Sequence, residues 1–118
     1  MTDRTMTVTC QTDPSGTTVL TVTGELDYHT APRLSHALDD TPFGPSTPVV
    51  IDLSELTYCD STGITALVTA YHRAQATGSR LFLSGVRHDL MRVFRTVGLD
   101  QVFTFHPTVE DAIDALRS

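Results

Sequence analysis

The residues best suited to chemistry in this sequence form one short run, Asp60-Ser61-Thr62-Gly63. The run follows an apolar stretch and precedes an amphipathic one, so Ser61 falls where a helix is expected to begin. The first amides of a helix lack partners within the helix, and the helix dipole favours negative charge there. The pattern therefore predicts Ser61 as a phosphorylation switch on a small binding module. The alternative is that Ser61 only caps the helix, a role worth about 1 kcal/mol.

Two further polar residues, Asp27 and His29, follow an expected strand. Together with Ser61 they could supply the nucleophile, base and orienting acid of a hydrolase. No G-x-S-x-G turn surrounds Ser61 and no oxyanion feature is evident, so we expect a protein that is not an enzyme. Asp27 can equally be a turn former after a strand, and Asp60 can be a first-turn acid that complements the helix dipole.

The sequence also bears on metal and nucleotide sites. The five histidines are scattered without ligand spacing, and the two cysteines form no C-x-x-C pair, so we expect buried thiols and neither metal nor cofactor. A phosphate-binding G-x-x-x-x-G-K-[ST] loop is missing, as is G-x-G-x-x-G. A bound nucleotide would therefore have to use the helix N-terminus alone, which remains an alternative.

Composition predicts a single domain over residues 1–118, with a short flexible N-terminus at 1–4. The formal net charge of −6 argues against nucleic acid as a partner, because phosphate binding needs clustered cations. The sequence shows no signal peptide and no apolar run near the ~20 residues that span a bilayer. We therefore expect no membrane association and a location in the reducing cytoplasm.

Hydrophobic periodicity predicts the elements of the first half. Alternating apolar residues indicate strands over 5–11 and 17–23, which the turn sequence at 13–16 joins into a hairpin. Thr30 is the expected N-cap of a short helix. A proline-rich loop at 41–48 then leads to the next strand.

The centre of the chain predicts a buried strand and a long helix. The β-branched run at 49–53 is typical of a strand covered on both faces, and 54–59 is expected to be a connection. The helix should begin at Ser61 and end before Gly78. The apolar face of this helix is expected at Ile64, Leu67, Val68 and Tyr71, with Ala66, Ala70 and Ala74 allowing close packing beside it.

The last third continues the alternation of strands and helices. Strands are expected over 81–83 and 102–105, with a helix between them that has its apolar face at Leu90, Met91, Phe94 and Val97. A capping sequence at Thr108 starts the final helix. The element order ββαβαβαβα predicts an α/β fold in which a mixed, mostly parallel sheet packs against helices.

Three landmarks in this order carry a family resemblance. They are Gly24-Glu25-Leu26-Asp27 with Thr30-Ala31, then Val50-Ile51-Asp52-Leu53 followed by Asp60-Ser61-Thr62-Gly63-Ile64, then Val97-Gly98-Leu99 followed by Val102-Phe103. Together they resemble the STAS domain, specifically the bacterial anti-sigma factor antagonists, over roughly residues 17–117.

The resemblance implies a protein-binding switch. In that family the unphosphorylated antagonist binds an anti-sigma factor and frees a sigma factor. The anti-sigma factor doubles as an ATP-dependent serine kinase, and a metal-dependent serine phosphatase resets the switch. Carried over, the resemblance makes Ser61 the phosphoacceptor, and its partner-binding residues are Asp27, Asp60, Ser61, Thr62 and Gly63. We expect Gly63, which lacks a Cβ, to let the partner approach the backbone closely.

The same resemblance leaves other functions open. STAS modules also serve as subunits of stress-signalling or lipid-transport complexes, as cytoplasmic tails of anion transporters, and as nucleotide-binding modules. The intact Asp-Ser-Thr-Gly run favours the phosphorylation switch over a purely structural subunit.

Overall fold

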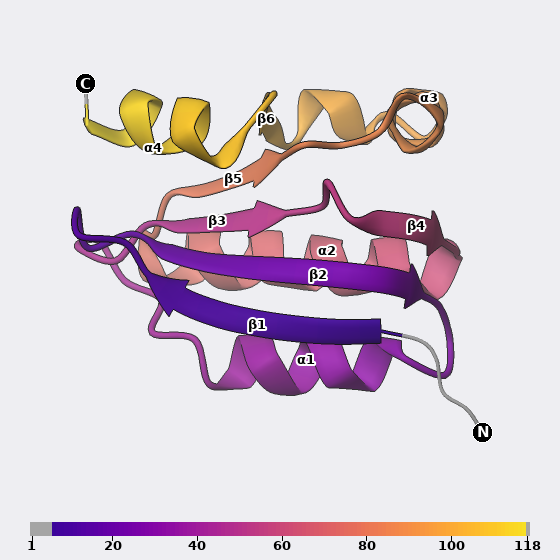
Figure 1. Cartoon of the computed structure of the whole chain (residues 1–118), viewed down its shortest axis with the longest axis horizontal. Coiled ribbons are helices and arrows are strands. Elements are labelled where there is room, and N and C mark those ends of the chain that lie inside the picture. The colour runs from indigo at the N-terminus through magenta and orange to yellow at the C-terminus, as the bar shows by residue number, and fades with distance from the viewer. Residues whose placement is uncertain (1–5, 118) are drawn as a thin grey trace.

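A six-stranded sheet forms the centre of the computed structural model, which describes residues 6–117 (Figure 1). The predicted flexible N-terminus at 1–4 lies outside the described residues. The strands are β1 (Met6–Thr12), β2 (Thr18–Leu26), β3 (Val49–Asp52), β4 (Leu56–Cys59), β5 (Leu81–Ser84) and β6 (Thr104–His106). Their order is β1-β2-β3-β5-β6, with β4 paired to β2. Of the strand pairs formed by residues 6–117, only β1–β2 is antiparallel, so the predicted mixed, mostly parallel α/β fold is confirmed.

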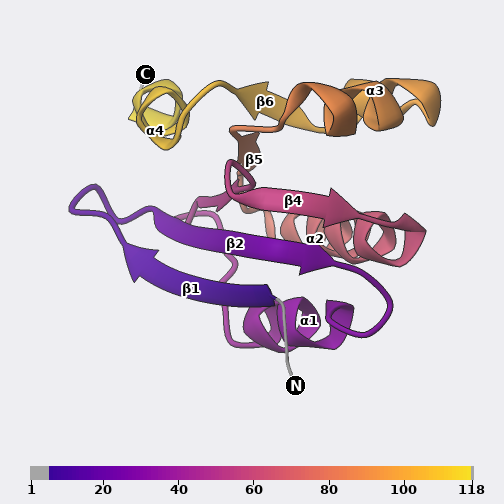
Figure 2. The same cartoon turned by 45° about the vertical axis from the view of Figure 1, so that its right-hand side comes forward.

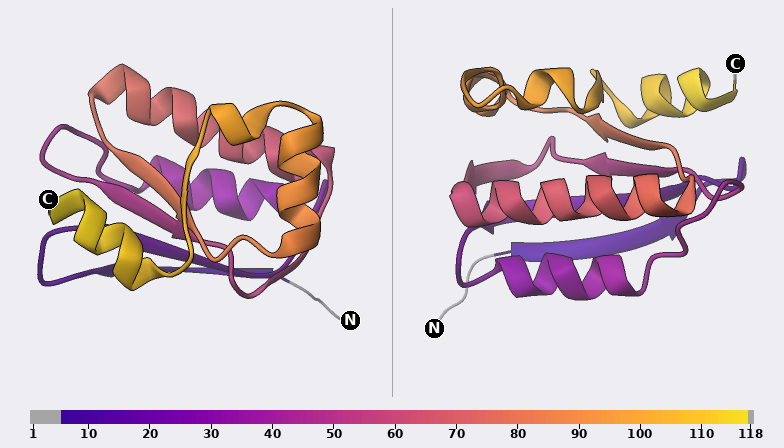
Figure 3. Two further views of the ribbon diagram at one scale, coloured as in Figure 1. Left: turned by 90° about the horizontal axis from the view of Figure 1, so that it is seen from above. Right: turned by 180° about the vertical axis from the view of Figure 1, so that it is seen from behind.

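Helices cover both faces of this sheet. They are α1 (Ala31–Asp39), α2 (Ser61–Thr77), α3 (His88–Thr96) and α4 (Val109–Arg117), with a 3-10 turn, η1 (Leu99–Gln101). The two helices α1 and α2 lie side by side behind the sheet, whereas α4 packs on the opposite face against β3 and β5 (Figure 3). The short helix α3 runs across one end, beyond β4 (Figure 2).

The main core lies between the sheet and the pair α1 and α2. Its fully buried members include Leu20, Ile51 and Leu67, and Phe94 enters it from α3. A smaller cluster on the other face packs Val50 against Phe82 and Ala112. Because the apolar residues of β3 are buried on both sides, the prediction of a strand covered on both faces is confirmed.

The segment expected to be a connection contains a strand instead. Within 54–59, β4 forms over Leu56–Cys59 and runs parallel to the second half of β2. The reason is length: β2 has nine residues and β3 only four, so the end of β2 needs another partner. Buried Leu56 anchors the strand, and this pairing sets Leu26 opposite Cys59, immediately before α2.

The predicted residues of α2 all face the core, but the centre of the buried face lies on the small residues. Small residues form most of it, and its buried members are Gly63, Ala66, Leu67, Ala70 and Ala74. By contrast Ile64, Val68 and Tyr71 are only half-buried. The sheet and α1 both approach α2 closely, so the alanines take the central contacts and the larger side chains fill the margins. Gly78 ends the helix in the left-handed conformation, as predicted.

Other local expectations were also wrong. Cys10 is exposed on the edge strand β1 and only Cys59 is partly buried, so the prediction of two buried thiols fails. Val97 is 57% exposed because it lies just past the end of α3, whose one fully buried residue is Phe94. The last strand begins at Thr104, two residues later than predicted, because the amides of Val102 and Phe103 still bond the carbonyl of Leu99 in the turn that follows η1. No helix among residues 6–117 combines the length and the apolar character needed to span a bilayer.

Candidate functional site at the start of α2

Ser61 is the first residue of α2, and its side chain is exposed. Its hydroxyl makes no hydrogen bond with any described residue, whereas its carbonyl accepts one from Thr65 Oγ1 at 2.9 Å. Within the same part of the chain, the amides of Ser61 and Thr62 also have no acceptor. An accessible hydroxyl therefore lies beside two open donors at the positive end of a helix of 17 residues.

The cap of α2 is Asp60, not Ser61. Asp60 Oδ1 accepts a hydrogen bond from the amide of Gly63 at 3.0 Å, and the backbone of Asp60 is extended, as an N-cap requires. The interpretation of Ser61 as a mere N-cap is therefore wrong. Asp60 precedes the first turn of α2. It therefore stabilises the start of the helix through its hydrogen bond with the amide of Gly63 as well as through its charge.

The second carboxylate oxygen of Asp60 reaches a distant segment. Asp60 Oδ2 accepts a hydrogen bond from the amide of Tyr28 at 3.1 Å, and the amide of Asp60 donates to the carbonyl of Leu26 at 3.1 Å. These contacts hold the β2–α1 loop against the start of α2, at the right-hand end of the sheet in Figure 1. Asp27 precedes Tyr28 directly, so the structure brings the two predicted acidic residues to the same end of the molecule.

Asp27 organises the turn into α1. Its Oδ1 accepts from the amides of His29 at 2.9 Å and Thr30 at 3.0 Å. Thr30 occupies the predicted N-cap position of α1, but its side chain caps no amide of that helix, because its hydroxyl donates to the carbonyl of Glu25 at 2.7 Å. Desolvation raises the pKa of Asp27, but the hydrogen bonds from Thr30 and His29 outweigh it and leave the pKa below its ordinary value of 3.8. Asp27 is therefore a turn former and a fixed negative charge at neutral pH.

Gly63 is buried, and its missing Cβ serves this chain's own packing. A Cβ there would lie 2.7 Å from Leu26 Cγ, 2.8 Å from Cys59 Sγ and 2.9 Å from the carbonyl oxygen of Leu26. We expected the missing Cβ of Gly63 to let a partner approach the backbone. This is wrong, because Leu26 and Cys59 already occupy the space that a Cβ would fill. Thr62 is half-buried beside it.

The Cys59 thiol lies just behind the cap and is not set up as a nucleophile. Desolvation, followed by the charge of Asp60, raises the pKa of Cys59 to about 12. Cys59 Sγ also donates to the carbonyl of Asp60 at 3.6 Å. The thiol therefore stays protonated at neutral pH, and the start of α2 carries no thiolate.

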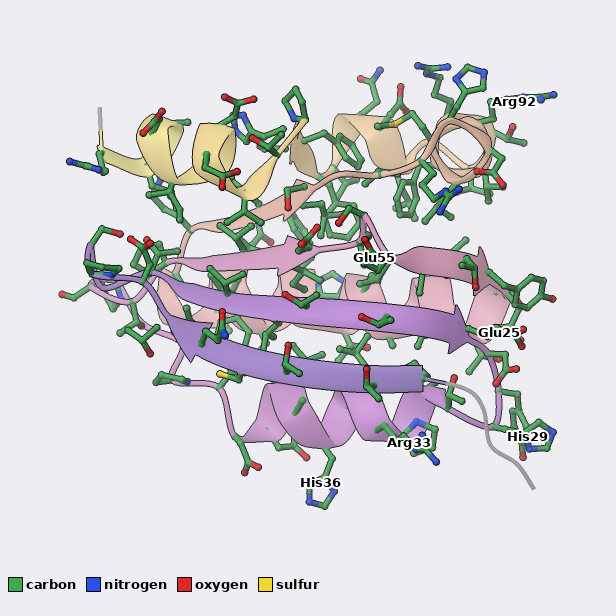
Figure 4. The ribbon with its side chains drawn as sticks, in the orientation of Figure 1. Glu25, His29, Arg33, His36, Glu55 and Arg92 are labelled. Atoms are coloured by element: carbon green, nitrogen blue, oxygen red, sulfur yellow. The ribbon has the colours of Figure 1, made fainter. Side chains whose placement is uncertain are left out.

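The described residues do not assemble the hydrolase arrangement considered from the sequence. His29 points outward from the loop, and its ring packs edge-on against Tyr28 with 5.5 Å between centroids (Figure 4). Asp27 bonds the backbone amide of His29, and no hydrogen bond joins the His29 ring to Ser61. Within residues 6–117, no group of three His, Cys, Asp or Glu side chains is placed to hold a metal ion.

Sequence reasoning missed two aromatic residues near this site. Tyr28 is 72% exposed in the β2–α1 loop, and Tyr58 is 53% exposed in β4. Exposed aromatic rings beside a candidate binding site are typical of protein interfaces. Tyr58 lies in β4, a strand that the hydrophobic periodicity did not indicate, so no sequence pattern pointed to this residue. The signal for Tyr28 was its place between Asp27 and His29, in a segment expected to be a surface turn.

Comparison with known proteins gives the same family from the sequence and from the structure. The STAS domain family matches residues 9–112. The anti-sigma-B factor antagonist of Listeria monocytogenes is 36% identical over 81 residues, covering 69% of this chain and 71% of that protein. The anti-sigma-F factor antagonist RsfB of Mycobacterium tuberculosis is 30% identical over 107 residues, covering 89% and 85%.

Two solved structures share the architecture. An anti-sigma factor antagonist from Mycobacterium paratuberculosis superposes with a TM-score of 0.82 at 30% identity, covering 97% of this chain and 96% of that one. The phosphorylated form of the Bacillus cell fate determinant SpoIIAA gives a TM-score of 0.72 at 22% identity, covering 93% and 99%. At that identity the second likeness concerns the fold alone.

Proposed function

The chain belongs to the STAS domain family, and on this premise we propose that it is an anti-sigma factor antagonist switched off by phosphorylation of Ser61. The observation that carries the proposal is the state of Ser61: an exposed hydroxyl that bonds no residue within 6–117, at the first residue of a long helix. A structural serine at a helix start would be expected to cap the helix, but Asp60 already does so. The hydroxyl of Ser61 is therefore free for a partner.

The partner in this proposal is an anti-sigma factor that is also an ATP-dependent serine kinase, acting in the cytoplasm. It binds the unmodified surface formed by Asp27, Asp60, Ser61 and Thr62, while buried Gly63 contributes by positioning them. Transfer of the γ-phosphoryl group from the partner's ATP to Ser61 Oγ releases ADP and a proton. A metal-dependent serine phosphatase then hydrolyses the phosphoserine and restores the hydroxyl. The antagonist itself supplies the acceptor and catalyses neither step.

The fold is expected to tolerate the phosphate, whereas the interface is not. The phosphate adds about −1.5 to −2 charges, and the open amides of Ser61 and Thr62 can receive it. Asp60 cannot turn away, because two backbone amides hold its carboxylate. A partner surface that fitted a neutral hydroxyl then has to desolvate a dianion beside a fixed carboxylate. A loss of about 3 kcal/mol weakens binding more than a hundredfold.

The test is calorimetric titration of the purified anti-sigma factor with Ser61 variants, with and without ATP. Ser61→Ala is expected to bind equally in both conditions, whereas wild type loses affinity with ATP and gains one phosphate at Ser61 by mass spectrometry. Ser61→Asp should bind at least tenfold more weakly while its melting temperature stays close to that of wild type. Thr69→Asp, an exposed position on the same helix, is the matched control and should bind like wild type.

Two outcomes would contradict the proposal. One is a Ser61→Asp variant that binds as tightly as wild type. The other is an ATP-dependent phosphate that appears on wild type and equally on Ser61→Ala, because the acceptor would then be a different residue.

A further inference from the structure

A groove beside the proposed switch lies between β4 and α3. Strand β4 pairs with β2 along one edge, and its other edge has no strand neighbour among residues 6–117. Helix α3 lies beyond that edge, above β4 in Figures 1 and 2. The space between them is a cavity of about 170 Å³, lined by Leu56–Cys59 together with Asp89, Leu90 and Val93.

The groove continues directly from the Ser61 site. Its lining ends at Cys59, the residue before the cap Asp60. Tyr58 and Val93 form its rim and are 53% and 40% exposed. Tyr28, which is 72% exposed, joins the same end of the molecule through its hydrogen bond to Asp60. Large exposed apolar side chains therefore gather around the start of α2, a distribution typical of an interface centre.

The size and charge of the groove specify what it can hold. At roughly 30 Å³ per water, the cavity has room for about five or six water molecules, which one aliphatic side chain could displace. Among the described residues, Asp89 is the only charged one in the lining, and none of the lining residues is a cation. Arg92 of α3 points away from the sheet toward solvent (Figure 4). The groove therefore matches an aliphatic side chain with a cationic neighbour.

We propose that the β4–α3 groove is a second contact for the anti-sigma factor, holding one Leu, Ile, Val or Met side chain of that partner next to a Lys or Arg that pairs with Asp89. This proposal rests on the proposed function. The groove contributes affinity in both states of the switch, and Ser61 alone responds to phosphorylation. Binding energy and switching are thus assigned to adjacent but separate surfaces.

The experiment measures the affinity of Val93→Glu for each purified anti-sigma factor encoded in the same genome. Val93 is exposed, so the variant should fold, and its melting temperature checks this. Val102→Glu is the matched control, because Val102 is 36% exposed against 40% for Val93 and does not line the groove. We expect at least tenfold weaker binding for Val93→Glu and unchanged binding for Val102→Glu. Tyr58→Ser, at the opposite rim, should also weaken binding.

The outcomes separate the two proposals. If Val93→Glu and Tyr58→Ser bind like wild type while Ser61→Asp loses affinity, the groove proposal is overturned and the proposed function stands. An equal loss of affinity in Val93→Glu and Val102→Glu also overturns the groove proposal, because the added negative charge alone would then explain the loss. If wild type binds none of the anti-sigma factors, the proposed function fails and the groove proposal fails with it.

Discussion

At the scale of single residues, Asp60 joins two segments that are far apart in the chain. One oxygen caps α2 through Gly63, and the other holds the amide of Tyr28. Hydrogen bonds to a charged acceptor are stronger than neutral ones, about 1.5–3 kcal/mol each against about 1 kcal/mol. The carboxylate therefore sets both the start of the helix and the position of the loop that carries Asp27.

The depressed pKa of Asp27 predicts an acid-dependent loss of stability. Because its pKa is lower in the folded state than its ordinary value of 3.8, the stabilising effect of Asp27 is full above that pH. It is lost as the pH falls further, through the folded-state pKa. Asp27→Asn removes the titrating group, so the difference in unfolding free energy between wild type and variant should shrink below pH 3.8. Urea unfolding between pH 7 and 3 measures this, and a constant difference would contradict it.

The two cysteines are expected to react at very different rates. Cys10 is exposed on β1, whereas Cys59 is partly buried with its pKa raised to about 12. Only the thiolate reacts with alkylating reagents, so native protein at pH 8 should be modified at Cys10 first. Peptide mass spectrometry after iodoacetamide treatment identifies the site, and urea-unfolded protein provides the control in which both residues react. Modification of native Cys59 as fast as Cys10 would show that the thiol is not shielded.

At the scale of elements, the position of Ser61 depends on how closely α2 approaches the end of β2. The contact runs through Gly63, with Leu26 on one side and Cys59 on the other. Pairing of β2 with β4 sets these two residues opposite each other. The site therefore depends on a strand-to-helix contact that only a glycine allows.

Gly63→Ala is expected to destabilise the protein. Alanine favours a helix over glycine by about 1 kcal/mol, but overpacking of a tight site costs about 1–3 kcal/mol. The cost of overpacking is expected to exceed the gain in helix propensity. The new Cβ would lie 2.9 Å from the carbonyl oxygen of Leu26, so the backbone would have to shift. Chemical denaturation measures the change. Thr65→Ala, an exposed position in the same helix, should change stability by less than about 0.5 kcal/mol. A more stable Gly63→Ala would refute the packing account.

At the scale of the whole molecule, the sheet separates two apolar clusters of unequal size. The larger one lies under α1 and α2, and the smaller one, around Val50 and Phe82, lies under α4. The Ser61 site is built on the side of the larger cluster. Since that cluster supports both α2 and the end of β2, most of the stability of the site is expected to come from it.

Truncations in the two clusters should therefore differ in cost. Leu67 is fully buried in the larger cluster, and Leu67→Ala is expected to cost about 2–5 kcal/mol. Leu116 is only partly buried at the edge of the smaller cluster, so Leu116→Ala should cost about 1 kcal/mol or less. Urea midpoints of the two variants, compared at equal m-values, provide the measurement. Equal costs would mean that the two clusters support the fold equally.

Local sequence patterns predicted those elements that depend on interactions between neighbouring residues. The strands β1 and β2 and the helix end at Gly78 depend on neighbouring residues, and the structure confirms these elements. The predicted alternation of burial is not complete, since Cys10 is exposed and Thr18 is buried. The start of α2 at Ser61 was also predicted correctly. The helical period placed the centre of the buried face of α2 on the large apolar residues, whereas the alanines are the more buried ones, because the pattern ranks side chains by hydrophobicity. Close packing favours the small ones instead.

The sequence by itself determined the alternation of strands and helices, the family resemblance and the presence of a hydroxyl at the start of a long helix. Only the tertiary structure decided what surrounds that hydroxyl. Pairing of β4 with β2, the bond from Tyr28 to Asp60 and the contact of Gly63 with Leu26 all join segments about 30 or more residues apart. Contacts at such separations depend on which strand ends lie together when the sheet forms. No local period in the sequence determines which ends these are.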